Sequence, residues 1–108
     1  MVETMDQTIS TSLADECRVA IASLERARAA PPSQFIDEST AALRSAVLVR
    51  DALIARLPAG DSAGRAALDQ VNLALSLIVS LVYPAAGLIR ENIDPARGAL
   101  QSLLALLE

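Results

Sequence analysis

Residues 70–89 read QVNLALSLIVSLVYPAAGLI, a stretch of about twenty positions without one charged side chain. Its first part predicts an α-helix that is apolar over most of its circumference. The polar exceptions recur three or four positions apart and form one narrow line along the helix: Asp69, Asn72, Ser76 and Ser80. A helix with so little polar surface has to be enclosed. We therefore expect other helices of the chain, a second copy or lipid to cover it.

The composition predicts an all-α protein. Phe35 and Tyr83 are the two aromatic residues among 108, and 53% of the chain is hydrophobic. Strands favour aromatic and β-branched residues, whereas Ala, Leu, Arg and Glu favour helix. A chain of this length forms one domain that buries about two-thirds of its unfolded surface. The surplus of apolar residues therefore indicates self-association or a partner.

Turn signals divide the chain into four helices. We expect them at residues 8–29, 33–57, 62–83 and 95–107, after a flexible tail at 1–7. Pro31 and Pro32 end the first helix, and Pro58 ends the second. Short connections make successive helices antiparallel. The prediction is an up-down bundle of three long helices and a shorter carboxy-terminal one, completed by oligomerisation.

The segment between the last two helices is less regular. Pro84 ends or kinks the third helix, so that residues 84–93 form a kink or a short helical connector. Asp94-Pro95 then predicts a restart, because aspartate is a favoured N-cap residue and proline suits the first helical position.

Catalytic and metal-binding functions are disfavoured by composition. The chain has no His, and all its basic residues are Arg. Histidine is the usual general acid or base at neutral pH, and zinc and di-iron sites usually require it. Adjacent carboxylates such as Asp15 and Glu16 point apart on a helix. We therefore expect a protein that is not an enzyme and has no metal site and no cofactor.

Cys17 is the single cysteine, and it lies in the middle of the apolar stripe of the first helix. Reactive thiolates occupy electropositive, partly open settings, so this position predicts a buried core thiol. One unpaired cysteine fits a reducing compartment, and the acidic amino terminus does not resemble a signal peptide. A cytoplasmic location is expected.

The charge and hydropathy of the chain bear on nucleic acid and membranes as partners. The net charge is −4 and the Arg residues form no stripe, which argues against nucleic-acid binding. The stretch at 70–89 satisfies the length rule for a membrane span, but its strongly apolar part is about eleven residues long. Insertion of 70–89 into a membrane, or an apolar ligand inside the bundle, remain the alternatives.

A protein–protein contact is the main expectation for the third helix. Small residues four apart, such as Ser76 and Ser80, let a second backbone approach closely, whereas a solvent-facing stripe normally carries Glu, Arg or Lys. The sequence predicts an interaction or oligomerisation module, such as an adaptor, chaperone-like or assembly subunit, that binds itself or another helical protein. The expected contact residues are Asn72, Leu73, Ser76, Val79, Ser80, Tyr83, Leu100, Leu103, Leu104 and Leu107.

Overall fold

A computed structural model describes the backbone of residues 2–56, 62–83 and 90–108, and the side chains of residues 13–55, 64–83 and 91–108. The elements are α1 (Val2–Ala29), α2 (Pro32–Arg56), α3 (Ser62–Val82), the short 3₁₀ helix η1 (Arg90–Asn92) and α4 (Ile93–Leu107). These described ranges contain no strand. The predicted all-α class is confirmed.

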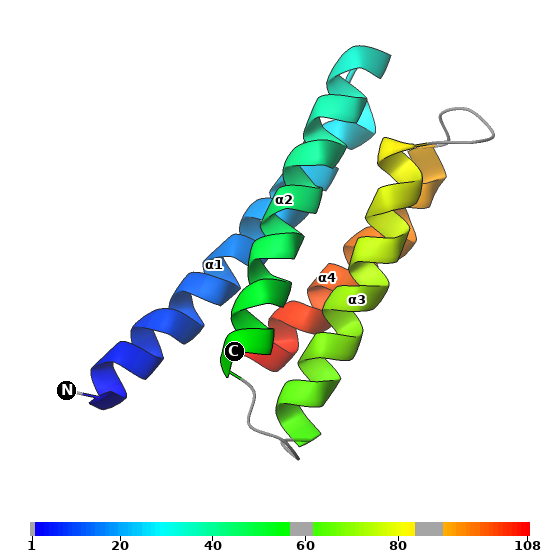
Figure 1. The fold of residues 1–108 in the computed structure, drawn as a ribbon. Coiled ribbons are helices and arrows are strands. Elements are labelled where there is room, and N and C mark those ends of the chain that lie inside the picture. The colour runs from blue at the N-terminus through cyan, green and yellow to red at the C-terminus, as the bar shows by residue number, and fades with distance from the viewer. Residues whose placement is uncertain (1, 57–61, 84–89) are drawn as a thin grey trace.

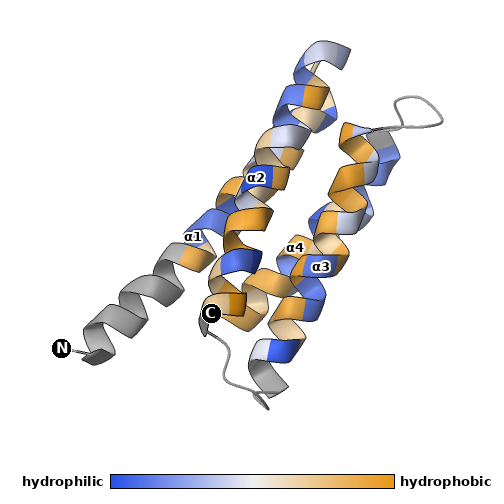
Figure 2. Ribbon diagram, viewed as in Figure 1, coloured by the Kyte–Doolittle hydropathy of each residue, from blue (hydrophilic) through white to orange (hydrophobic). Residues whose placement is uncertain are grey.

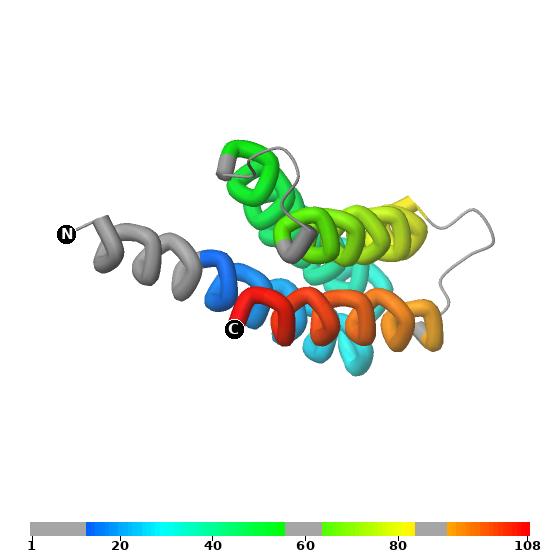
Figure 3. The backbone as a smooth tube through the Cα atoms, turned by 90° about the horizontal axis from the view of Figure 1, so that it is seen from below, coloured from blue at the N-terminus to red at the C-terminus, as the bar shows by residue number. Residues whose placement is uncertain are grey.

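The four α-helices pack as a bundle. α1 packs against α2 and α4, and α3 packs against the same two helices. Figures 1 and 3 together show two layers, with α2 beside α3 in one layer and α1 beside α4 in the other. Each helix therefore has two neighbours and one side turned away from the bundle.

The helix bounds lie close to the predicted ones except at the amino terminus. α2 begins at Pro32, where the missing N–H of proline costs no helical hydrogen bond. α1 begins at Val2, six residues before the predicted start, so the expected tail is helical from that residue onward. Extending a helix that already exists adds one hydrogen bond for each residue fixed, and no Pro or Gly occurs among residues 2–7 to prevent it.

The start of α4 differs from the prediction, because Asp94 is not its N-cap. α4 begins at Ile93, and Asn92 before it has helical dihedral angles of φ −68° and ψ −12°. Because η1 leads directly into α4, the backbone is already helical before Asp94. The carboxylate lies in the first turn, where the helix dipole favours negative charge. Of the expected connector at 84–93, residues 84–89 lie outside the described part.

The core lies between the inner faces of the four helices. Figure 2 shows hydrophobic segments along each of them. The largest fully buried apolar side chains are Leu24, Phe35, Val49, Val71, Ile78, Leu81, Ile93, Leu100 and Leu103. Between them lie alanines with no exposed surface, including Ala20, Ala42 and Ala74. Small side chains at such positions let neighbouring backbones approach closely, so a core with few aromatic residues can still be well packed.

Candidate functional site

The outer side of α3 exposes apolar side chains to solvent. Leu73 is 49% exposed, Val79 42% and Tyr83 74%. The opposite side of the helix is buried, with Val71, Ala74, Leu75, Ile78 and Leu81 in the core. The structure thus separates α3 into a core face and a face that α1, α2 and α4 leave open.

The exposed residues form one continuous surface because they recur three or four positions apart. We call this surface the uncharged α3 face, and it comprises Asn72, Leu73, Ser76, Val79, Ser80 and Tyr83, all of them exposed. Residues 70–83 contain no charged side chain. Arg65 and Asp69, both exposed, precede it at the amino-terminal end of α3. The face is therefore an apolar and weakly polar patch bounded by charge at one end.

One serine of this face uses its hydroxyl proton within the helix. The Ser80 hydroxyl donates a hydrogen bond of 2.6 Å to the carbonyl oxygen of Leu77 in the same helix. A serine that donates to its own helix in this way has no hydroxyl proton left to donate to a partner. The centre of the face therefore carries small, uncharged side chains, and the larger side chains Leu73 and Tyr83 lie toward its two ends.

The predicted contact residues of α4 lie elsewhere. Leu100 and Leu103 have no exposed surface and belong to the core. Leu104 and Leu107 are half-buried against that core. When a short helix has one apolar stripe, that stripe normally packs into the bundle. The structure therefore does not bring these four leucines together with the uncharged α3 face on one open surface. Leu106, off the stripe, is 49% exposed.

Ion pairs join the outer edges of α1 and α4, and we call this region the α1–α4 seam. It comprises the pairs Arg18–Glu108, Arg28–Asp94 and Glu25–Arg97, the last at 3.0 Å between Nη1 of Arg97 and Oε1 of Glu25. Arg97 also lies 3.7 Å from the Asp94 carboxylate. Glu25 and Arg28 also lie three positions apart in α1, a spacing that permits an ion pair within one helix. Such spacing does not show that each has a partner in α4, because those partners lie more than sixty positions away.

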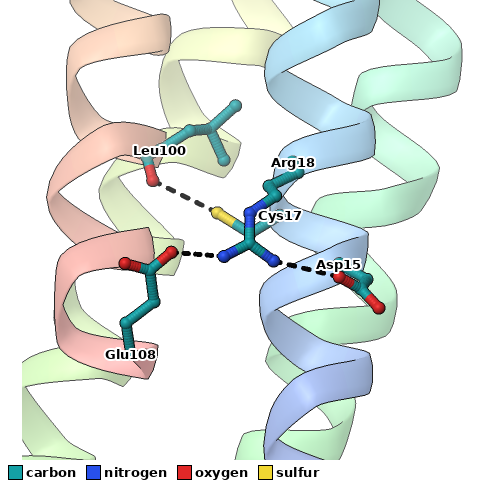
Figure 4. A network of polar contacts seen from close by, with 5 residues as sticks. All are labelled: Asp15, Cys17, Arg18, Leu100 and Glu108. Carbon is teal, nitrogen blue, oxygen red and sulfur yellow. Dashed lines mark hydrogen bonds and ion pairs between the residues drawn. The ribbon is translucent and has the colours of Figure 1, made fainter.

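Figure 4 shows one end of the seam, where the Arg18 guanidinium lies between the carboxylates of Asp15 and Glu108. Asp15 and Arg18 form a pair at 2.9 Å and are three positions apart, a spacing that brings side chains together on one helix. At the other end, the hydrogen bond from Arg28 lowers the pKa of the Asp94 carboxyl, although burial opposes this effect. The seam therefore neutralises its charges in pairs.

Cys17 lies beneath the seam and is 1% exposed. Its thiol donates a hydrogen bond of 3.2 Å to the carbonyl oxygen of Leu100 in α4. Burial raises the pKa of this thiol to about 11, while Arg18 acts in the opposite direction. The thiol is therefore protonated at neutral pH and lacks the exposed thiolate that nucleophilic chemistry needs. The prediction of a buried core cysteine is confirmed.

Other features of the described residues offer less to a ligand. No group of three or more Cys, Asp or Glu side chains in the described part could hold a metal ion. A hollow of about 410 Å³ lies on α2, and the described residues that line it are Leu43, Arg44, Val47 and Leu48. All four of these described residues belong to α2.

One described helix segment, Gly64–Val82, is long and apolar enough to cross a membrane, with a mean hydropathy of 1.4. One-third of this segment is buried inside the bundle. Core helices of soluble proteins pass the same test of length and composition. The segment therefore fits both a membrane span and a core helix.

Comparison with known proteins adds no relative to these observations. The chain matches no protein-family model, no curated protein and no solved structure.

Proposed function

We propose that this protein is a non-catalytic interaction module that binds a helical partner through the uncharged α3 face. The partner is a second copy of the chain or another protein. The four helices, in an antiparallel up-down order, serve as the scaffold that presents this face. The observation that carries the proposal is the exposure of Leu73, Val79 and Tyr83 on a face without charge from residue 70 to residue 83.

The outer face of α2 provides the contrast that supports this proposal. Leu48 and Ile54 are also exposed there, but Arg44 and Asp51 are exposed beside them. Scattered apolar side chains among charges are normal on a protein surface. A contiguous apolar patch without charge more often marks an interaction site. The uncharged α3 face has the second pattern.

The non-catalytic part of the proposal rests on the residue types present. The chain has no His or Lys, and its one thiol is buried and protonated at neutral pH. We also propose a cytoplasmic location, since an unpaired cysteine is typical of proteins in a reducing compartment.

A membrane is the second candidate partner, because Gly64–Val82 satisfies the length and composition of a span. Insertion would withdraw Val71, Ile78 and Leu81 from the core, where each is 2% exposed or less. It would also carry Asn72 and the serines of the face into lipid, where unpaired polar groups are costly. A protein partner requires neither change, and we therefore favour it.

Site-specific photocrosslinking tests the proposal. A photoreactive amino acid replaces Ser76 in one variant and Ser102 in another, because Ser102 is also exposed but lies on α4. We expect the probe at position 76 to yield a covalent adduct with a protein, either this chain or another, and the probe at position 102 to yield much less. Introducing Leu73→Arg beside the probe should suppress the adduct.

Two outcomes would contradict the proposal. Equal adducts from positions 76 and 102 would mean that the uncharged α3 face has no special role. An adduct with phospholipid alone at position 76, identified by mass spectrometry, would favour the membrane as partner.

A further inference from the structure

We infer that the occupant of the uncharged α3 face is a second copy of this chain, bound antiparallel across a two-fold axis that passes beside Ser76. This inference rests on the proposed function and names its partner. In a two-fold symmetric dimer the same patch is used by both copies, so the patch must be complementary to itself.

The order of residues along α3 has this self-complementarity. An axis at Ser76 places each residue opposite the one equally far beyond Ser76 on the other copy. Leu73 then faces Val79, so that two aliphatic side chains meet. Asn72 faces Ser80, so that the amide can donate to a hydroxyl oxygen. Ser76 faces its own copy, and its small side chain lets the two backbones approach.

The ends of the face are also matched in this arrangement. Asp69 of one copy lies opposite Tyr83 of the other, and both are exposed in the single chain. The phenolic hydroxyl is a hydrogen-bond donor and the carboxylate is an acceptor. A parallel arrangement would instead place the two Asp69 carboxylates opposite each other, where like charges repel. The charge pattern therefore favours the antiparallel pair.

The charge distribution permits a second copy at this face and disfavours a membrane there. Each chain carries −4, so two copies that associate through a charged surface would repel each other. Residues 70–83 carry no charge, and contact there avoids this repulsion. Helices that lie on a bilayer usually carry Lys or Arg along their polar face. Asp69, Asn72, Ser76 and Ser80 do not provide such a face.

The size of the face indicates a weak dimer. Residues 72–83 span about 18 Å of helix, which presents less than the roughly 800 Å² that each partner contributes to a standard interface. We therefore expect a weak dimer, in which the proportion of monomer and dimer changes with concentration. Light scattering over a range of concentrations should show the mass rise from one chain to two.

Cysteine crosslinking tests both the partner and the geometry, because the native Cys17 is buried and does not compete. A disulfide requires two Cα atoms about 4.4 to 6.8 Å apart. We expect Ser76→Cys to form covalent dimers in oxidised glutathione at least about tenfold faster than Leu106→Cys. Leu106 is an exposed control on α4.

A mixture of two variants distinguishes the two directions. An equimolar mixture of Asn72→Cys and Ser80→Cys should form the mixed dimer faster than either variant forms its own dimer. Faster dimerisation of Asn72→Cys with itself would indicate a parallel pair and overturn the inferred geometry. Each variant is first checked for an unchanged melting temperature.

Different results would overturn the inferred second copy and the proposed function. A constant monomer mass, together with equal crosslinking of Ser76→Cys and Leu106→Cys, would overturn the inference that the partner is a second copy. The proposed function would stand in that case if the photoreactive probe at position 76 captures a different protein, and would fall if it captures none. Flotation with phosphatidylcholine vesicles that is lost on Ser76→Arg would overturn both.

Discussion

The α1–α4 seam and the uncharged α3 face are both exposed surfaces, but they differ in how their side chains are satisfied. At the seam, Arg28 pairs with Asp94 and Arg97 pairs with Glu25, so each of these charges has a partner within the chain. On α3, Leu73, Val79 and Tyr83 expose apolar area that no part of the described chain covers. The ion pairs of the seam form within a single chain, whereas the α3 face leaves apolar area that a partner can remove from water.

The difference also shows which exposed features stabilise the single chain. Exposed ion pairs contribute little because water and salt screen them. The apolar side chains beneath the seam contribute more, since their removal from water is the main favourable term in folding. The seam pairs align α1 with α4, while Leu100 and Leu103 beneath them hold the two helices in place.

The largest expected effect separates a buried leucine of α4 from an exposed leucine of α3. Leu103→Ala should lower the free energy of unfolding by about 2 to 5 kcal/mol, because it leaves a cavity in the core. Leu73→Ala should change it by no more than about 0.5 kcal/mol in dilute solution. Urea unfolding of both variants measures the difference. Similar losses would mean that the α3 face is covered in the single chain.

The second effect concerns the thiol beneath the seam. The pKa of Cys17 is raised to about 11 in the folded chain, so the unfolded chain loses this proton first as the pH rises. The protonated thiol contributes its full stability to the folded chain below the usual thiol pKa of about 8.5. This contribution is lost as the pH rises to about 11. We expect wild-type stability to fall by on the order of 2 kcal/mol across this interval.

Cys17→Ala is the matched control, because it should show a weaker decline between those pH values. Chemical denaturation at pH 8, 9.5 and 11 provides the measurement. Parallel declines in both proteins would show that Cys17 ionises freely in the folded state. Iodoacetamide should likewise modify the native protein slowly at pH 8 and the urea-unfolded protein quickly.

The smallest effect belongs to the ion pair between α1 and α4. The hydrogen bond from Arg28 lowers the pKa of Asp94, so this carboxyl stabilises the folded chain above its usual pKa of about 3.9 and ceases to do so as the pH falls through the lowered value. Asp94→Asn should reduce the melting temperature slightly at pH 7 and leave it unchanged below the lowered pKa. Thermal melts over a series of pH values downward from pH 7 measure this. A loss that does not shrink as the pH falls would assign the effect to packing instead of charge.

Adding salt should sharpen the same comparison. Screening weakens exposed ion pairs, so high salt should diminish the effect of Asp94→Asn at pH 7. Association through the uncharged α3 face should persist in high salt, because it depends on apolar contact.

Local sequence patterns predicted most of the fold. Prolines and capping residues placed the end of α1, both ends of α2 and the start of α3 within one residue of the observed positions. The two failures have different causes. The first helix was predicted to begin at residue 8, but α1 extends to Val2, and no proline or glycine among residues 2–7 stops it. Asp94-Pro95 has the residues typical of a helix start. The preceding turn is already helical, however, and the Asp94 carboxylate pairs with Arg28.

The candidate site was predicted in part. The residues predicted on the third helix share one exposed face, because their spacing places them on one side of any regular helix. The α4 leucines have equally good spacing, yet Leu100 and Leu103 are buried. Periodicity identifies an apolar face, but it does not tell whether that face meets the core or solvent.

The sequence by itself determined the helical class, the approximate helix bounds and the absence of charge from residue 70 to residue 83, because these depend on neighbours within a few positions. The tertiary structure alone decided which apolar stripes are covered and which charges are paired. Both depend on residues distant in the chain, such as Arg18 with Glu108 and Cys17 with Leu100. Burial and pairing are properties of packed helices, and a single helix does not contain the surface that covers it.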